Sequence, residues 1–388
     1  MRSAIPLASA LFAATTPAFA AYNLIKEYQG SSFFSGWEFY GNYDNLTNGD
    51  VTYVNQANAT ASKLAYVNDA GHAIIKVDDT SVVQWNYKRN SVRIETLDYF
   101  PIGTILLFDA VHVPYGCSVW PSFWTKGPNW PAGGEIDVLE AVNLMTANQM
   151  AIHTSTGCTV SGTDCSQGSG CTVMEKQANS YGQAFATAGG GVWATQFDTT
   201  GINSHSIWFW SRNNIPDSVK SATSMIDPSS WGTPSAAYPS DSSCDIANFF
   251  TPQQLVLDVT LCGDWAGAAS IYEQTCGVQG QVNASSCYLD NVINQGNYSS
   301  AYFEISYVKA FTSAADTFVP TISGASTVLV SATASGTAAS SSSTSGSGKS
   351  NSTSTGSGSG NGAVEVAPGV YVAVLAGSLL SLFTWAMI

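Results

Sequence analysis

Charged residues are scarce in this chain, and basic ones are the scarcest. Its 388 residues include 13 Lys and Arg against 27 Asp and Glu, which gives a formal net charge of −14. The few cations form no basic stripe along the sequence. Because nucleic-acid binding depends on clustered Lys and Arg that neutralise phosphates, we expect no nucleic-acid partner.

Histidine is also rare, with only four in the chain, and no Cys pair has zinc-site spacing with a neighbouring His. The sequence therefore predicts no zinc site. We expect chemistry without a metal or organic cofactor, with a structural cation on a surface loop left open. All eight Cys lie between Cys117 and Cys287, and their even number suggests disulfides. The spacing does not select one pairing. Since Cys158, Cys165 and Cys171 crowd one Gly/Ser-rich loop, at least one bridge is expected to pin it.

Sustained helical periodicity is missing ahead of the C-terminal tail. The apolar runs are short and strand-like, and Gly, Asn, Asp and Pro separate them. The clearest runs are residues 72–77, 91–95, 104–108, 207–210, 254–259 and 302–308. Many short strands without intervening helices predict an all-β fold of antiparallel sheets packed as a sandwich.

Both ends of the chain have the composition of removable signals. An apolar run ends in Ala18-Phe19-Ala20, which fits a signal-peptide cleavage site. The uncharged run Val370–Ile388 follows a spacer of small residues, which is typical of a GPI-attachment signal, with a tail anchor as the alternative. The predicted segments are a signal peptide (1–20), one globular domain (21–319), a Ser/Thr/Gly-rich stalk (320–362) and a GPI-attachment propeptide (363–388).

These segments predict a secreted, extracellular protein held at the plasma membrane or cell wall through a GPI anchor alone. Sequons fit a glycosylated surface, and they occur at Asn45, Asn58, Asn283, Asn297 and Asn351. We expect the protein to be a monomer.

Three carboxylates are packed into one short segment, Glu135-Ile136-Asp137-Val138-Leu139-Glu140. β-Branched Ile136 and Val138 favour a strand, on which Glu135 and Asp137 share a face. Regular alternation would send Glu140 to the other face, and a β-bulge at Val138-Leu139 would return it. Adjacent buried acids push their pKa values apart, as glycosidases require. The alternative is a solvated acidic strand edge, which would not need the apolar residues between the acids.

An aromatic segment precedes the acids. Three Trp and three Pro within Val119–Pro131 predict a loop that leads into the acidic strand. Trp124 and Trp130 are expected to stack on sugar rings, and Trp120 is expected in the core. The alternative for all three is ordinary packing.

The strands on either side of residues 143–148 are predicted to form a hairpin with Glu140 opposite Ala151. That register places His153 near Asp137, although a slip of one residue would reverse its face. The alternative for His153 is a buried side chain satisfied by the backbone.

These residues resemble glycoside hydrolase family 16, and in particular the fungal endo-1,3(4)-β-glucanases of laminarinase type. The resemblance runs from about Phe33 to Val308. It rests on Glu135–Glu140, on Trp120-Pro121-Ser122-Phe123-Trp124, on Ile152-His153-Thr154 and on Cys262-Gly263-Asp264-Trp265-Ala266-Gly267. Lichenases and the yeast wall transglycosidases have the motif without the bulge, from which this chain departs.

The resemblance implies a β-jelly roll with a cleft across a concave sheet, and it makes residues 21–319 a catalytic domain. It implies that Glu135 is the nucleophile, Glu140 the acid/base and Asp137 the carboxyl between them. Further cleft positions in the family match Trp124, Trp130, His153 and, more weakly, Arg93.

The function predicted is retaining endohydrolysis of β-1,3- and mixed β-1,3/1,4-glucan, with β-glucan as the partner. One alternative is a wall-glucan transglycosylase that uses the same residues with a sugar acceptor. The other is a non-enzymatic glucan-binding lectin on the same sandwich, which would not need three adjacent carboxylates.

Overall fold

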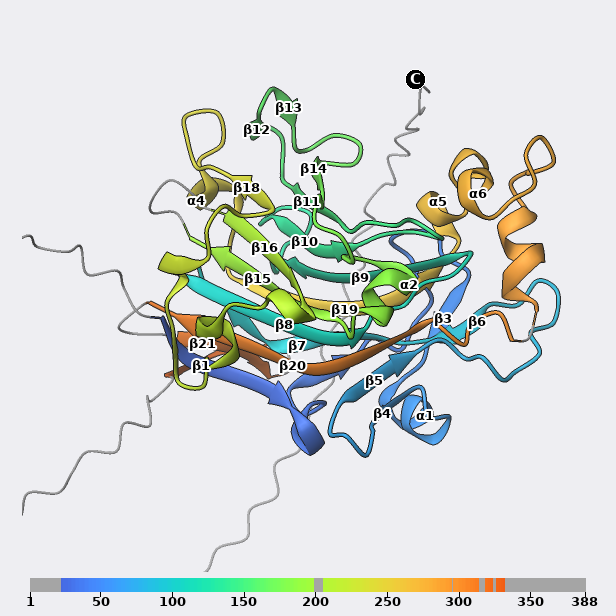
Figure 1. Ribbon diagram of the computed structural model, residues 1–388, viewed down its shortest axis with the longest axis horizontal. Helices are drawn as coiled ribbons and strands as arrows, with labels where there is room; N and C mark the ends of the chain where they lie inside the picture. Colours follow the sequence, from blue (N-terminus) through green and yellow to red (C-terminus); the bar gives the residue numbers. More distant parts are fainter. Residues whose placement is uncertain (1–21, 199–204, 295, 314–317, 324–325, 332–388) are drawn as a thin grey trace, which may run out of the picture. The chain divides into compact units, whose positions relative to one another are not determined.

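The computed structural model of the protein describes residues 22–198, 205–294, 296–313, 318–323 and 326–331, the last two ranges by their backbone alone. Two large antiparallel sheets dominate this part of the chain (Figure 1). The predicted all-β sandwich is therefore confirmed. Among the described residues no helix has the length and apolar character needed to cross a bilayer. The predicted signal peptide (1–20) and GPI-attachment propeptide (363–388) lie outside the described residues.

The first sheet has the strand order β17-β1-β20-β8-β15-β16-β18, with β5 and β4 attached beside β20. Its strands are β1 (Tyr22–Gln29), β4 (Ala65–Val67), β5 (Ala73–Lys76), β8 (Thr104–His112), β15 (Gly191–Phe197), β16 (His205–Ser211), β17 (Met225–Ile226), β18 (Ala236–Tyr238) and β20 (Tyr302–Thr312).

The second sheet has the order β14-β11-β10-β9-β19-β7-β21-β22, with β2 beside β7. Its strands are β2 (Trp37–Phe39), β7 (Arg93–Phe100), β9 (Val119–Lys126), β10 (Glu135–Glu140), β11 (Gln149–His153), β14 (Cys171–Met174), β19 (Gln253–Leu261), β21 (Phe318–Ser323) and β22 (Ser326–Ser331).

Two small ladders and a set of short helices lie in the connections between the strands of the sheets. The ladders are β3 (Val51–Tyr53) with β6 (Arg89–Ser91), which is parallel, and β12 (Thr159–Val160) with β13 (Thr163–Asp164). The helices are η1 (Gly30–Ser32), α1 (Gln56–Ala61), α2 (Gly182–Thr187), η2 (Arg212–Asn214), α3 (Asp217–Lys220), η3 (Pro228–Ser230), α4 (Ile246–Phe249), α5 (Gly263–Ala266), α6 (Ala269–Thr275) and η4 (Tyr288–Val292).

The core lies between the two sheets and fixes which face of the second sheet is left for a site. Phe108 on β8 stacks on Phe123 on β9, with ring centroids 4.3 Å apart. Both rings are buried, and burying such a side chain contributes roughly 1.5–3 kcal/mol. Since side chains alternate along a strand, Phe123 facing the core turns Ser122 and Trp124 to the opposite face.

The outer face of the first sheet is covered by the protein itself. Leu107 on β8 and Trp208 and Trp210 on β16 belong to a second buried cluster, to which Trp231 just after η3 contributes. The indole of Trp231 lies edge-on to both β16 tryptophans, at 5.1 and 5.4 Å between ring centroids. A cleft for a ligand is therefore left to the outer face of the second sheet.

Segment 119–126 is a strand, and the predicted loop is wrong there. β9 pairs with β10 on one side and β19 on the other. Prolines are usually absent from central strands because they lack a ladder N–H. Pro121 is tolerated because β10 ends at Glu140, opposite Ser122, which leaves β19 as the only one of the described strands that pairs at Pro121.

A further hairpin occupies the start of the segment predicted as a stalk. β21 and β22 pair from Phe318–Ser331 to Ser323–Ser326, and β21 meets β7 at Thr321 and Asp98. Several β-branched residues on either side of Gly324-Ala325 account for these strands. Residues from 332 onward lie outside the described ones.

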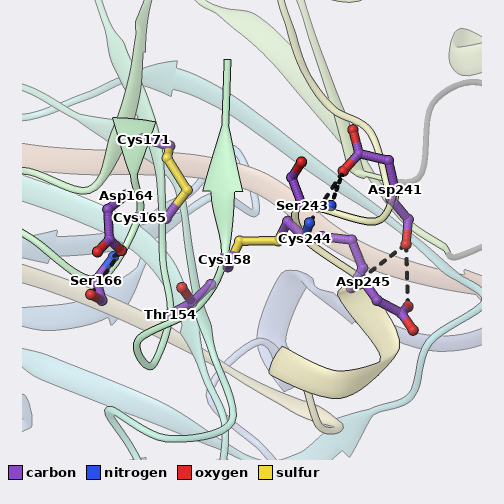
Figure 2. Close-up of a disulfide and its surroundings, with 12 residues drawn as sticks. Thr154, Cys158, Asp164, Cys165, Ser166, Cys171, Asp241, Ser243, Cys244 and Asp245 are labelled. Carbon is purple, nitrogen blue, oxygen red and sulfur yellow. Dashed lines mark hydrogen bonds between the residues drawn. A yellow bond between two sulfur atoms is a disulfide. The ribbon is translucent and has the colours of Figure 1, made fainter. Parts of the chain in front are cut away.

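Four disulfides join all eight cysteines, and two of them pin the loop that follows His153, as predicted. Cys165–Cys171 closes the loop on itself, and Cys158–Cys244 ties it to the segment before α4 (Figure 2). The other two bridges are Cys117–Cys276 and Cys262–Cys287. Cross-links of this kind stabilise mainly by restricting the unfolded chain.

Candidate active site

Strand β10 carries its three acids on one face by means of a bulge. Its pairing with β9 shifts between Asp137 and Leu139, and its pairing with β11 shifts between Asp137 and Glu140. Val138 and Leu139 are both fully buried. The bulge predicted at this dipeptide is confirmed, and Glu135, Asp137 and Glu140 all line one cavity.

The cavity beside the acids has a volume of about 130 Å³. It is lined by Asp44, Leu46, Thr47, Tyr53, Arg93, Trp120, Ser122, Trp124, Trp130, Glu135, Asp137, Glu140, Asp258 and Thr260. A larger cavity of about 710 Å³ lies beside α2 and residues 144–146, and no carboxylate or histidine lines it. Because bond cleavage needs convergent titratable groups, chemistry and not size identifies the smaller cavity as the site.

Glu140 is held by the indole of Trp120, whose Nε1–H donates to Glu140 Oε1 over 2.8 Å. Burial raises the pKa of Glu140 to about 8, the charges of Glu135 and Asp258 act in the same direction, and hydrogen bonds from Trp120 and Ser122 oppose them. Glu140 is therefore protonated at neutral pH, the state that a general acid requires.

The bulge itself is clamped by Asn148, which is fully buried and immediately precedes β11. Its Oδ1 accepts the backbone N–H of Glu140 over 2.9 Å, and its Nδ2–H donates to the Val138 carbonyl over 2.9 Å. One amide side chain thus satisfies two backbone groups that the irregular ladder leaves unpaired.

Glu135 and Asp137 form a coupled pair. Burial raises the pKa of Asp137 well above its usual range, and the charges of Glu135 and Glu140 add to that effect. Burial also raises the pKa of Glu135, but the charge of His153 and hydrogen bonds from Trp130 and Asp137 oppose the rise. The proton that the pair shares therefore resides on Asp137, which leaves Glu135 as the anion.

His153 lies opposite Glu135, and its Nε2 is 3.5 Å from Asp137 Oδ2. The predicted proximity to Asp137 is confirmed, but the predicted register is wrong, because Glu140 pairs with Gln149 and not with Ala151. The strand ends at Glu140, two residues earlier than expected, and the chain then turns through a longer connection. Both registers leave His153 on the same face.

The atoms of Glu135, Asp137 and His153 that could bind a metal lie within 4.8 Å of one another. Three such ligands suffice geometrically for a cation. The proton shared by Glu135 and Asp137 neutralises part of the negative charge that would attract such a cation.

Arg93 and Trp124 both line the cavity and contact one another. The Arg93 guanidinium lies between the rings of Tyr40 and Trp124, 4.6 and 5.3 Å from their centroids. Arg93 also donates to Glu95 Oε1, while Lys126 donates to Glu95 Oε2 over 2.7 Å. Because Arg93 is only 3% exposed, its main contacts are with the protein.

The three tryptophans differ in accessibility. Trp130 is 37% exposed and donates its indole N–H to Glu135, whereas Trp124 is 7% exposed and donates to Asp258 over 2.8 Å. Of the two predicted stacking residues, only Trp130 presents an open ring. Trp120 is buried, as predicted, but its bond to Glu140 makes it part of the site as well.

Sequence reasoning missed Trp120, Asn148, Tyr53, Asp44 and Asp258 as residues of the site. Trp120 and Trp124 are four residues apart and share one face of β9, because side chains alternate along a strand. That alternation would have placed Trp120 in the site if the segment had been predicted as a strand. No comparable signal marks the others, of which Tyr53, Asp44 and Asp258 come from distant parts of the chain.

Comparison with known proteins agrees with this geometry. A family model described as the XgeA-like catalytic GH16 domain matches residues 37–311. The chain belongs to glycoside hydrolase family 16. It thereby carries a glycoside hydrolase catalytic domain, as the sequence resemblance predicted.

Curated relatives include a protein named as a probable glycosidase from Schizosaccharomyces pombe, 37% identical over 73% of this chain and 68% of the relative. Another is named as a probable endo-1,3(4)-β-glucanase from Aspergillus fumigatus, 38% identical over 75% of this chain and 45% of the relative. The chain therefore spans under half of the Aspergillus protein.

Two solved structures share the fold at useful identity. Laminarinase 16A from Phanerochaete chrysosporium, with β-glucans bound in donor and acceptor sites, is 32% identical with a TM-score of 0.68 over 76% of this chain and 100% of that chain. An elongating family 16 β-1,3-glucosyltransferase is 33% identical with a TM-score of 0.67 over 75% of this chain and 100% of that chain.

Proposed function

We propose that this protein is a retaining endo-β-glucanase that hydrolyses β-1,3- and mixed β-1,3/1,4-glucan. One observation carries the proposal: the bulged β10 brings Glu135, Asp137 and Glu140 to one cavity in unlike protonation states. The names of the fungal relatives and the glucans bound to the laminarinase support the substrate class.

In this mechanism Glu140 donates its proton to the glycosidic oxygen while Glu135 attacks the anomeric carbon. The C–O bond to the leaving chain breaks, and an ester bond forms between Glu135 and the sugar. Glu140, now anionic, takes a proton from water, which hydrolyses the ester with a second inversion and hence net retention. Asp137 holds the proton that it shares with free Glu135, and it stabilises the carboxylate when that group leaves.

The direct test is to incubate the globular domain with laminarin, lichenan and xyloglucan and to size the products. Hydrolysis of laminarin and lichenan to short oligosaccharides, with xyloglucan intact, is the expected result. No shortening of either β-1,3-containing glucan would contradict the proposal.

A glucan transglycosylase is the second candidate, and the similar glucosyltransferase structure favours it. The same residues would serve, with a sugar hydroxyl in place of water as the acceptor. Products longer than the starting oligosaccharide would distinguish transfer from hydrolysis. A lectin without activity is disfavoured, because binding a neutral sugar does not need a shared proton and a protonated Glu140.

We also propose that the protein is secreted and held at the cell surface by a GPI anchor. The signal-peptide and tail patterns of the sequence support this, and so do four disulfides that leave no free cysteine among the described residues. Release from membranes by a phosphatidylinositol-specific phospholipase C is expected, and recovery of the Val370–Ile388 peptide from the mature protein would contradict it.

A further inference from the structure

A fourth carboxylate, Asp258, stands in line with Glu140 across three neighbouring strands. Glu140 pairs with Ser122 on β9, and Ser122 pairs in turn with Asp258 on β19. Directly opposed residues share a face of a sheet, so all three side chains point into the cavity, which each of them lines. Two strand spacings separate the Glu140 and Asp258 backbones by about 10 Å, and their side chains bridge part of that gap.

Both carboxylate oxygens of Asp258 accept hydrogen bonds from the protein, which leaves little hydrogen-bonding capacity for a sugar. Its Oδ1 accepts the indole N–H of Trp124 over 2.8 Å, and its Oδ2 accepts the hydroxyl of Tyr53 over 3.2 Å. The side chain is 7% exposed, and Arg93 pairs opposite it on β7. Two donors and a neighbouring cation favour the anionic form of a carboxylate.

We propose that Asp258 is a positioning residue whose fixed negative charge sets the acidity of Glu140 in both halves of the reaction. The inference rests on the proposed function, because it concerns the acid/base assigned there. In the free enzyme the charge of Asp258 favours the protonated acid. Once Glu135 is esterified and has lost its charge, Asp258 remains as a fixed carboxylate that sustains the basicity of Glu140.

Other charged and titratable groups also face Glu140. Glu135 and Asp137 come from its own strand, His153 from β11, Arg93 from β7, and Asp44 and Tyr53 from the 44–53 segment. Burial raises the pKa of Asp258 to about 6, with the charge of Arg93 opposing the rise. Asp258 is thus ionised over the range in which Glu140, with a pKa of about 8, loses its proton.

The test is the pH dependence of kcat/KM on laminarin for Asp258→Asn and Asp258→Ser. These two neutral residues differ in shape and share only the loss of charge. Both should move the basic limb of the profile down by about half a unit to one unit. The acidic limb, which reports Glu135, should move less, because Glu135 stands in line with Lys126 and Gln254, four residues along β19 from Asp258.

Asp44→Asn is the matched control. Asp44 is also a buried cavity carboxylate, and its Oδ2 accepts from Thr260, two residues along β19 from Asp258. The charges that raise the pKa of Glu140 most are those of Glu135 and Asp258, so the loss of the Asp44 charge should leave the basic limb where it is, whatever it does to the rate.

A lowered rate with an unmoved basic limb in both Asp258 variants would overturn the inference. So would a failure of both variants to fold, judged by thermal melting, since Asp258 would then be a structural residue. If the native enzyme cleaves no glucan at all, the proposed function itself fails. A native bell-shaped profile with an unmoved limb in the variants would remove the role of Asp258 alone.

Discussion

Trp120 donates its indole N–H to the carboxylate of Glu140 over 2.8 Å, from a strand whose segment reads in sequence as a Pro-broken loop. A hydrogen bond to a charged group favours the ionised form, so this contact restrains a pKa that burial raises. In the proposed mechanism, Trp120 therefore helps Glu140 to lose its proton when its role changes from acid to base.

Trp120→Phe should consequently move the basic limb of kcat/KM to higher pH, the direction opposite to that of the Asp258 variants. Hydrogen bonds to charged groups contribute about 1.5–3 kcal/mol, so turnover should fall by about tenfold or more. The measurement is a pH–rate profile with laminarin. A basic limb that moves down would show that the indole does not act on Glu140 as described.

Glu135→Gln and Glu140→Gln should each lower turnover by about 10²–10⁴-fold or more. Asp137→Asn should have a milder effect, because it changes only the carboxyl that shares a proton with the proposed nucleophile. Azide should rescue a Glu135→Ala variant as an α-glycosyl azide and a Glu140→Ala variant as a β-glycosyl azide. Turnover close to native for Glu135→Gln would contradict the nucleophile assignment.

The same Glu140→Gln variant should be more stable than the native protein at neutral pH. The pKa of Glu140 in the folded protein is about 8, which exceeds its value in the unfolded chain. The contribution of Glu140 to the free energy of unfolding is therefore fully present below about pH 4 and declines as pH rises toward 8. The gain in melting temperature of the variant should therefore grow from pH 4 to pH 8. A gain that shrinks over that range would contradict the raised pKa.

Asn148→Ala should loosen the bulge. It leaves the Glu140 N–H and the Val138 carbonyl without their partner, and an unsatisfied buried group costs about 1–3 kcal/mol. Urea denaturation should show that loss, and kcat should fall with KM little changed because Glu140 is displaced. Gln149→Ala, at the neighbouring half-exposed position, is the control and should be nearly neutral in both measurements.

Substitution by Ala should have different effects at Trp130 and at Trp124. Trp130, with an open ring, should weaken oligosaccharide binding by about 1–3 kcal/mol, taking base–aromatic stacking as the analogue, with little change in melting. Trp124, buried between Arg93 and Asp258, should cost about 3–5 kcal/mol of stability. Paired melting and binding measurements decide, and equal effects of the two substitutions would contradict the difference in exposure.

Much of the site could be predicted from local sequence, because its central element is local. Glu135, Asp137 and Glu140 lie on one strand, and side-chain alternation with one extra residue at Val138-Leu139 places them on one face. What local pattern could not supply was long-range pairing. Asp258 reaches Glu140 only through the ladder of β9 with β19, whose register is set by the packing of the whole sheet.

Single residues that break a local rule account for the remaining errors. Pro121 makes the segment of β9 resemble a loop in sequence. β9 accommodates this proline because β10 ends at Glu140, and that end depends on tertiary structure. The predicted register of β10 with β11 is wrong because Asn148 clamps the bulge and the pairing ends early. Neither effect follows from propensity or periodicity.

The stereochemistry of hydrolysis tests the central claim most directly, since the bulged strand has meaning for catalysis only if Glu135 and Glu140 act together on one glycosidic bond. Proton NMR of products formed from laminarin in the first minutes should show the β-anomer ahead of mutarotation, as double displacement requires. An initial α-anomer would mean inversion and would contradict the assignment of Glu135 as the nucleophile.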